Sequence, residues 1–277
     1  MHDKKISLLL CTAIALTVSN MANAGILDKF APAGDNTKPL WADEPLVTDP
    51  SCDTFTFQNV LSFMDSYIKT EELQDTVDDL SASAQELMQS YTTASILLNR
   101  SQLCLAEALE LKEVTETLTK EKKILLSGTS LSKKEIKKHR SYSETASNEI
   151  IKATAQVDEL KPEQRKNFSL GAGTYLAGSH TTSQILEDAR AYATKATNAA
   201  KDCKENASTN NSVMDKFSSS LTCAQGPGKA ANLLGILGSG GPDYTKNILD
   251  TGNSILEYSK ANKIELPPDS SKFVTSF

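Results

Sequence analysis

Apolar residues recur at helical spacing over most of the chain, and the longest regular stretch begins near Leu73. From Leu73 to Ala94 the apolar positions alternate steps of four and three residues, and they then fall every seven residues, at Leu97, Cys104, Leu111, Leu118 and Leu125. This period is typical of a coiled-coil seam. The pattern predicts one helix over residues 71–126, about 80 Å long at 1.5 Å per residue, with a candidate kink at 96–100 where the register shifts.

Two further long helices are predicted after a break at Ser127-Gly128-Thr129. Ser132 and Glu135 have the spacing of a capping box, which predicts a helix over 132–160 that stops before Pro162 and forms a hairpin with 71–126. The apolar stripe resumes over 162–203, and Gly171 and Gly178 lie on it. Small residues allow helices to approach closely, so both glycines predict close helix packing. A ligand-shaped notch is the alternative.

Shorter elements are predicted on either side of the long helices. Residues 54–68, 213–221, 230–237 and 244–258 have apolar positions at helical spacing. Residues 25–51 contain four prolines, which predicts an extended arm, and we expect Trp41 to dock on the helical body rather than stay exposed. The apolar run 230–238 is expected to cap the bundle, with insertion into a bilayer as the alternative.

These patterns together predict an all-α fold. We expect an elongated bundle of long antiparallel coiled-coil-like helices with shorter C-terminal helices. The helical bundle domain is assigned to residues 52–266, and residues 267–277 form a C-terminal tail.

The first 24 residues have the three parts of a cleavable signal peptide. Lys4 and Lys5 make the start basic, an apolar stretch runs from Ile6 to Val18, and Ala22-Asn23-Ala24 is a small-x-small cleavage site. We therefore expect cleavage after Ala24 and a periplasmic or secreted mature protein. A lipoprotein signal at Cys11 is disfavoured because Leu10 is large.

Four cysteines remain after such a cleavage: Cys52, Cys104, Cys203 and Cys223. An even count in an oxidising compartment predicts two disulfides, for which three pairings exist. We predict Cys52–Cys104 and Cys203–Cys223, the second because it closes a short loop. Metal binding is the rival interpretation. It is disfavoured because the chain has no CxxC motif and no histidine near these cysteines in the sequence.

No motif for catalysis, a cofactor or a metal is present, so the sequence favours a non-enzymatic protein without cofactors. His139 and His180 belong to no HExxH or GxSxG signature; His139 is expected on a solvated helix face among lysines. Neighbouring acids such as Glu71 and Glu72 are expected to solvate a helix. The formal net charge of −6 disfavours nucleic acid as a partner.

One basic cluster stands out against this acidic background. It would lie at the tip of the predicted hairpin, where it could contact anionic lipid or polysaccharide; the alternative is an ordinary solvated turn. Its members are Lys120, Lys122, Lys123, Lys133, Lys134, Lys137, Lys138 and Arg140.

The function that these features favour is an exported helical scaffold or binding protein of the bacterial envelope. Its expected partner is another envelope protein. The coiled-coil-like seams would also allow the chain to form an oligomer. The alternative is a membrane-acting protein, lipid-binding or pore-forming-like, that uses the basic tip.

Overall fold

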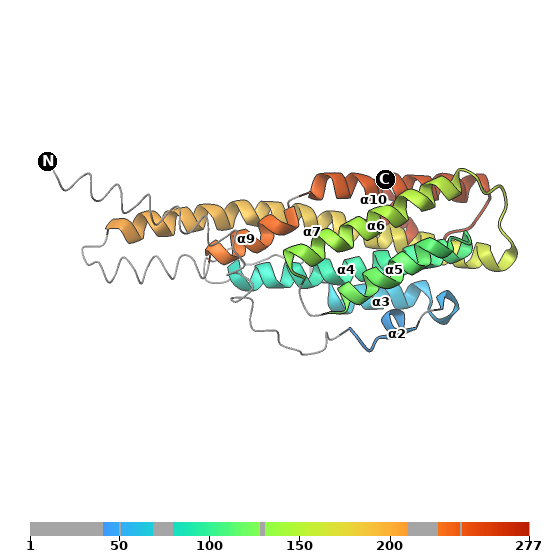
Figure 1. Cartoon of the computed structure of the whole chain (residues 1–277), viewed down its shortest axis with the longest axis horizontal. Coiled ribbons are helices and arrows are strands. Elements are labelled where there is room, and N and C mark those ends of the chain that lie inside the picture. The colour runs from blue at the N-terminus through green and yellow to red at the C-terminus, as the bar shows by residue number, and fades with distance from the viewer. Residues whose placement is uncertain are drawn as a thin grey trace. The chain divides into compact units, whose positions relative to one another are not determined.

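The computed structural model describes residues 41–49, 51–68, 80–127, 131–209, 227–238 and 240–276, all within one compact unit, Pro39–Phe277. These residues fold into helices that pack against one another, and no strand occurs among them (Figure 1). The predicted all-α class is confirmed. The signal peptide, residues 25–40 of the arm and the predicted helix 213–221 lie outside the described residues.

In chain order the elements are α2 (Pro45–Thr48), the 3₁₀ helix η2 (Cys52–Thr54), α3 (Phe57–Tyr67), α4 (Leu80–Ala108), α5 (Lys112–Leu125), α6 (Lys133–Thr154), α7 (Pro162–Thr209), α9 (Pro227–Gly238), α10 (Gly241–Ala261) and η3 (Ser270–Ser276).

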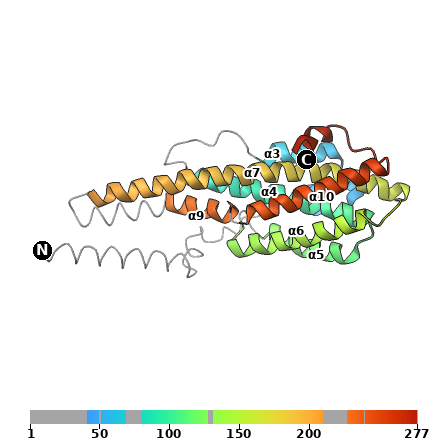
Figure 2. The same ribbon diagram turned by 90° about the horizontal axis from the view of Figure 1, so that it is seen from above.

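Helices α4 and α7 form the centre of the bundle and run antiparallel to each other. Gly171 of α7 lies against Leu105 of α4, whereas Gly178, two turns later, lies against Leu97. Tyr91 and Tyr175 are fully buried in this region. Helix α9 lies along α7, and α6 and α10 pack on each other (Figures 1 and 2).

The prediction of one helix over 71–126 is wrong, because the chain reverses at residues 109–111. Glu110 has a φ of 59°, and the backbone N–H of Leu111 donates to the carbonyl of Ala106 at 2.8 Å, which closes α4. Helix α5 then returns along α4 and buries Val114 and Leu118 in a second apolar cluster with Leu103, Ala106 and Ala146 of α4 and α6. The apolar residues that recur every seven positions therefore lie on two helices, α4 and α5, with a turn between them. Helix α4 runs unbroken through the predicted kink at 96–100.

The predicted start of the next helix is confirmed. The backbone N–H of Glu135 donates to Ser132 Oγ at 3.3 Å, and Glu135 Oε2 accepts from the backbone N–H of Ser132 at 2.7 Å. The hairpin that this capping box begins joins α5 to α6, so it is shorter than the one predicted.

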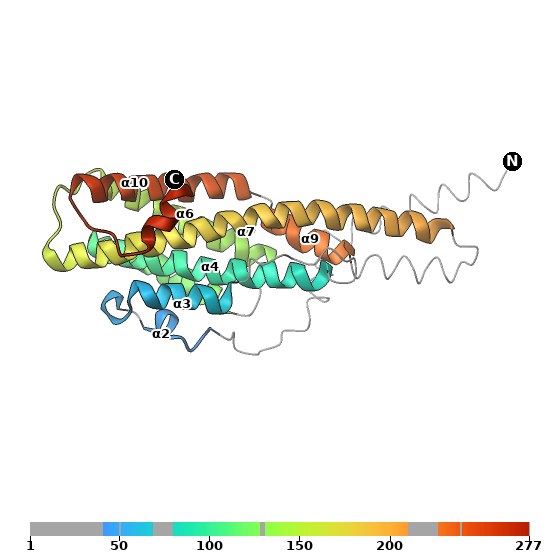
Figure 3. The same ribbon diagram turned by 180° about the vertical axis from the view of Figure 1, so that it is seen from behind.

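The end of the arm and the start of the tail both pack on the bundle. Trp41 is buried, as predicted, and its ring lies 6.2 Å from that of Tyr67. After α10 the chain returns to α7 (Figure 3), where Pro267 covers Gly173 and the ring of Phe273 lies 6.5 Å from that of Phe57. The apolar helix α9 buries Ala230, Leu234 and Leu237 within the bundle.

Candidate functional site

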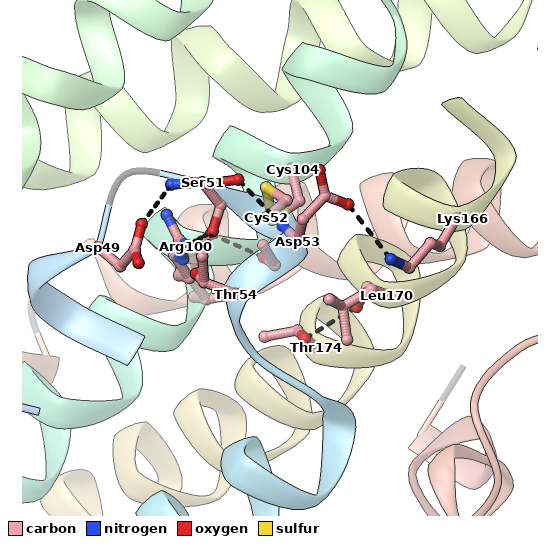
Figure 4. Close-up of a disulfide and its surroundings, with 12 residues drawn as sticks. Asp49, Ser51, Cys52, Asp53, Thr54, Arg100, Cys104, Lys166, Leu170 and Thr174 are labelled. Atoms are coloured by element: carbon pink, nitrogen blue, oxygen red, sulfur yellow. Dashed lines mark hydrogen bonds and ion pairs between the residues drawn. A yellow bond between two sulfur atoms is a disulfide. The ribbon is translucent and has the colours of Figure 1, made fainter. Parts of the chain in front are cut away.

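One disulfide ties the segment before α3 to the central helix. Cys52 in η2 and Cys104 in α4 are bonded, with their Cα atoms 5.5 Å apart, which confirms the first predicted pairing (Figure 4). Arg100, one turn earlier on α4, donates to the carbonyl of Ser51. Cys223 lies outside the described residues, so its pairing with Cys203 stays a prediction.

The basic cluster divides into an exposed surface and a buried residue. Lys120 and Lys123 are exposed near the end of α5, and Lys122 between them is half-buried. Arg140, in contrast, is buried, so its place in a surface cluster is corrected. The remaining members are exposed in the first turns of α6: Lys133, Lys134, Lys137 and Lys138.

His139 is fully buried rather than solvated, which corrects the sequence-based expectation. Its Nδ1 lies 2.5 Å from Oε1 of Glu121, and neither side chain is exposed. Oε2 of Glu121 accepts from Asn99 Nδ2 at 2.8 Å, and the hydroxyl of Tyr244 lies 3.5 Å from Nε2 of His139. The pair therefore joins α4, α5, α6 and α10.

Arg140 extends this buried polar cluster to a fifth helix. Its Nε donates to the hydroxyl of Tyr91 at 3.0 Å and its Nη2 donates to the carbonyl of Leu237, at the end of α9, at 2.7 Å. Its guanidinium carbon lies 5.5 and 5.4 Å from the ring centres of Tyr91 and Tyr244. Burial raises the pKa of both phenols, so they are neutral hydrogen-bonding groups at pH 7.

A second branch of polar contacts runs deeper between α4, α6 and α7. Gln102 Nε2 donates to the carbonyl of Ser143 and to Ser147 Oγ, both at 2.9 Å. Ser147 Oγ lies 3.4 Å from the hydroxyl of Tyr175. Burial of this hydroxyl raises the pKa of Tyr175 to about 12. The hydroxyl of Tyr244 donates to Ser143 Oγ at 3.3 Å and so joins the two branches.

Glu121, His139 and Tyr244 form a row of carboxylate, imidazole and phenol, which are the group types of acid–base catalysis, and the row is buried. Glu121 and His139 have no exposed surface, and Tyr244 is 4% exposed. A general base must come within hydrogen-bond reach of its substrate's proton. In this conformation the row can hold helices together and cannot meet a substrate from solution.

A sequence signal for this buried pair existed. Ile136, Ser143, Ala146 and Ile150 mark the inward face of α6, and His139 continues the same spacing of three and four residues. The basic residues on either side of His139, Lys138 and Arg140, favoured an exposed face instead. Glu121 has the same spacing of three and four residues, between Leu118 and Leu125, but one acid among lysines is typical of an exposed turn.

Gly171 and Gly178 lie where α7 approaches α4 most tightly. A Cβ added at Gly171 would lie 3.0 Å from Leu105 Cγ and 3.1 Å from Leu105 N, and one at Gly178 would lie 3.3 Å from Leu97 Cβ. Side chains and backbone of α4 thus occupy the space beside Gly171, and side chains of α4 occupy the space beside Gly178.

A small pocket opens between α2, α4 and α5. It encloses about 10 Å³, close to the minimum that one water-sized group needs. Arg100 and Lys122 line it together with Asn99 and aliphatic side chains: Leu46, Val47, Ile96, Leu125 and Leu126. Burial lowers the pKa of both Arg100 and Lys122, and the positive charge of Arg100 lowers that of Lys122 further.

The described ranges contain neither a membrane-spanning helix nor a metal-binding cluster. No helix in them is apolar enough over a sufficient length to cross a bilayer. No group of three or more His, Cys, Asp or Glu side chains in them is placed to hold a metal ion.

Comparison of the chain with protein-family models, with curated protein sequences and with solved structures gives no significant match.

Proposed function

We propose that the chain is an exported, non-enzymatic helical protein of the bacterial envelope that holds a fixed surface toward another envelope component. The observation that carries this proposal is the buried Glu121–His139 pair with its contacts to Asn99 and Tyr244. Groups suited to acid–base chemistry are here engaged in fixing helices to one another. A satisfied buried polar network specifies one arrangement of the elements, which is what a scaffold requires.

Two features support the placement in an oxidising compartment. The Cys52–Cys104 disulfide is compatible with export, because disulfides are rare in reducing cytosols. The first 24 residues contain, in the expected order, the basic start, the apolar stretch and the cleavage site of a signal peptide. We also propose that the antiparallel α4–α7 pair acts as the coiled-coil-like spacer of an elongated bundle.

Intact-mass analysis and cell fractionation of the natural host test the export step. We expect a mature chain that begins at Gly25, found in the periplasm or the medium. A cytoplasmic protein with its leader retained would contradict the proposal. Photo-crosslinkers placed at exposed α6 positions, such as Ser141 and Glu144, should then capture one defined envelope protein, whereas the same probe at buried Ile150 should not.

A second candidate function is binding to an anionic surface such as lipid or polysaccharide phosphate. The observation that favours it is the set of exposed lysines on both sides of the α5–α6 turn. Their potentials add locally although the protein as a whole is acidic. Each such base is worth about 1 kcal/mol near an anionic membrane.

Vesicle cosedimentation tests this candidate. Binding to anionic vesicles should fall as salt shortens the Debye length from about 10 Å at 0.1 M to about 3 Å at 1 M. Replacing Lys123, Lys133, Lys134 and Lys137 with Gln should abolish binding. A matched variant with Gln at four other exposed lysines, Lys161, Lys246, Lys260 and Lys263, has the same net charge and should still bind. Equal loss in both variants would show only a general effect of charge.

A further inference from the structure

We propose that a linear anionic polysaccharide binds to α5 and α6 along a strip of exposed lysines. The lysine strip consists of Lys120 and Lys123 of α5 and Lys134 and Lys138 of α6. This inference rests on the second candidate function, which leaves lipid and polysaccharide open as partners of the basic surface, and it selects the polysaccharide.

The buried contact between α5 and α6 fixes where the lysine strip lies. Nδ1 of His139 lies 2.5 Å from Oε1 of Glu121, and Lys138 and Lys120 each precede one of these residues in the sequence. Both lysines therefore lie at the same level of two helices that run side by side (Figures 1 and 2). Lys134 is one turn before Lys138, about 6 Å along the helix axis. The strip thus crosses from one helix to the other within a few turns.

The charges around the lysine strip leave it basic. Residues 120–138 include seven lysines and two glutamates, a formal charge of +5. From other elements, Asp49 acts electrostatically on Lys122, and Asp243 precedes Tyr244, whose hydroxyl contacts His139. The region stays positive with both aspartates counted, so its charge is complementary to that of an anionic ligand.

The exposure of these lysines requires a ligand with several charges. Solvent screens each exposed charge, so a single ion pair at this surface contributes little affinity. A ligand gains affinity when several of its charges contact several lysines at once, because each later contact is intramolecular. A chain of anionic groups meets this requirement, whereas a free phosphate or acetate ion does not.

An aromatic ring beside the lysine strip favours a sugar chain among such ligands. Lys138 Nζ lies 5.7 Å from the ring centre of Tyr142, one turn later on α6, and this ring is half-buried. Aromatic side chains supply apolar contact area next to polar groups. The C–H face of a sugar ring can pack against such a ring while its acid group contacts a lysine.

A flat bilayer fits the same lysines less well. Helix α7 continues past the level of the turn between α5 and α6, so a bilayer that approached this end of the hairpin would meet α7 first (Figure 1). A bilayer along the outer sides of the hairpin would meet Glu113, Glu116 and Glu144, which are exposed farther along the two helices. Among the described residues 120–127 and 131–140, no apolar side chain is exposed that could insert between lipids. A flexible chain can follow the lysine strip and avoid these groups.

Calorimetric titration of the full mature chain with oligogalacturonate, a linear polymer of acidic sugars, tests the proposal. We expect saturable binding by a long oligomer at low salt that weakens as the salt concentration rises. Monomeric galacturonate at the same carboxylate concentration should not compete. Vesicles with the same concentration of anionic headgroups should bind more weakly than the oligomer.

Two double variants of α6 locate the site. Lys134→Gln with Lys138→Gln should lower the affinity about tenfold or more, since each contact of this kind is worth about a factor of five. Lys133→Gln with Lys137→Gln removes the same charge from the same two turns, about 100° away around the helix, and should have a much smaller effect. Equal losses in the two variants would overturn the lysine strip as the site.

The remaining outcomes separate this inference from the function on which it rests. Vesicle binding as tight as oligomer binding would overturn the inference and leave the second candidate function standing. Absence of binding to both would overturn both and indicate a solvated turn. Tyr142→Leu keeps every charge and should weaken oligogalacturonate binding. If that variant binds normally and inorganic polyphosphate binds the wild type more tightly than oligogalacturonate does, the partner is another polyanion and the proposal is wrong.

Discussion

The two sides of α4 are built in different ways. Toward α7, small residues and apolar side chains bring the helices together, and Gly171 lies directly against Leu105. Toward α5 and α6, a small apolar cluster is joined to a buried polar network that includes Glu121, His139 and Gln102. The first interface depends on shape, whereas the second depends on every polar group having its partner.

This difference has an energetic consequence. Close packing of small residues loses stability gradually as volume is added, because neighbouring side chains can shift. A buried hydrogen-bonded polar pair loses stability abruptly when one partner is removed, because the other group stays buried without its hydrogen bond. The α5–α6 side of α4 should therefore be the more sensitive to single substitutions.

The largest effect is expected from Glu121→Ala. The change leaves the His139 imidazole and the Asn99 amide buried without their carboxylate. Each of these two buried groups costs about 1–3 kcal/mol when left without a partner, so the expected loss is about 2–6 kcal/mol. We expect the free energy of unfolding in urea at pH 7 to fall by that amount, with far-UV circular dichroism used to check that the variant folds.

An exposed ion pair provides the matched control. Lys152 and Glu149 are 2.6 Å apart on α6, with side chains 64% and 43% exposed. Glu149→Ala should cost less than about 1 kcal/mol. If the two variants lose equal stability, the buried polar network does not hold α5 and α6 to α4.

A smaller loss is expected on the α7 side, from Gly171→Ala. The added Cβ would lie 3.1 Å from the backbone nitrogen of Leu105, and backbone cannot move aside cheaply. Overpacking of this kind costs about 1–3 kcal/mol, partly offset by the better helix propensity of Ala, which is worth about 1 kcal/mol. Gly178→Ala meets only side chains, at 3.3 Å, and should be nearly neutral. Equal urea midpoints for the two variants would show that backbone proximity at Gly171 is unimportant.

The packing face of α7, though not its partner helix, was accessible from the sequence for a physical reason. Its apolar stripe repeats without interruption from Phe168 to Ala196, and a helix has only one way to bury such a stripe. The docking of Trp41 and the Cys52–Cys104 pairing also agree with the prediction.

The other side of α4 was misjudged, because the turn depends on tertiary context and the residue types of the buried pair outweighed its helical spacing. The turn at Glu110 has a positive φ without a glycine or asparagine to indicate it, and the seven-residue spacing continues across it. Glu121, His139 and Arg140 are charged or polar residues within a lysine-rich stretch, where burial is rare unless partners are present. Their partners, Asn99, Tyr91 and Tyr244, come from segments between 22 and 123 residues away from Glu121.

A gain of stability is expected where a helical glycine has no close neighbour. A Cβ at Gly235 in α9 would meet nothing within 4 Å, and the residue is exposed. Gly235→Ala should therefore raise the free energy of unfolding by about 0.5–1 kcal/mol through helix propensity alone. A loss of stability in this variant would show that Gly235 has a packing role like that of Gly171. Urea titration at pH 7 measures the sign.

The smallest effect is expected from the second histidine, His180, which is half-buried, whereas His139 is fully buried. The His180 ring is half-buried on α7, 5.7 Å from the ring of Phe273 in the tail, and burial lowers its pKa. In the unfolded chain a histidine titrates near pH 6.5, so below that pH the unfolded state binds more protons at this position than the folded state does. Its contribution to stability is therefore present above about pH 6.5 and is lost as the pH falls through the folded-state value.

The His180→Gln variant isolates this contribution. Between about pH 7 and pH 5 the free energy of unfolding of the wild type should fall slightly more steeply than that of His180→Gln, because only the wild type carries the group that gains a proton on unfolding. The difference should be small, since much of the ring is in contact with solvent, which screens the cost of the charge. Both proteins contain His139, so the comparison isolates position 180. A shallower slope in the wild type would mean that the protonated His180 ring is favoured at its site, for example by a cation–π contact with Phe273, and that burial does not decide its charge state.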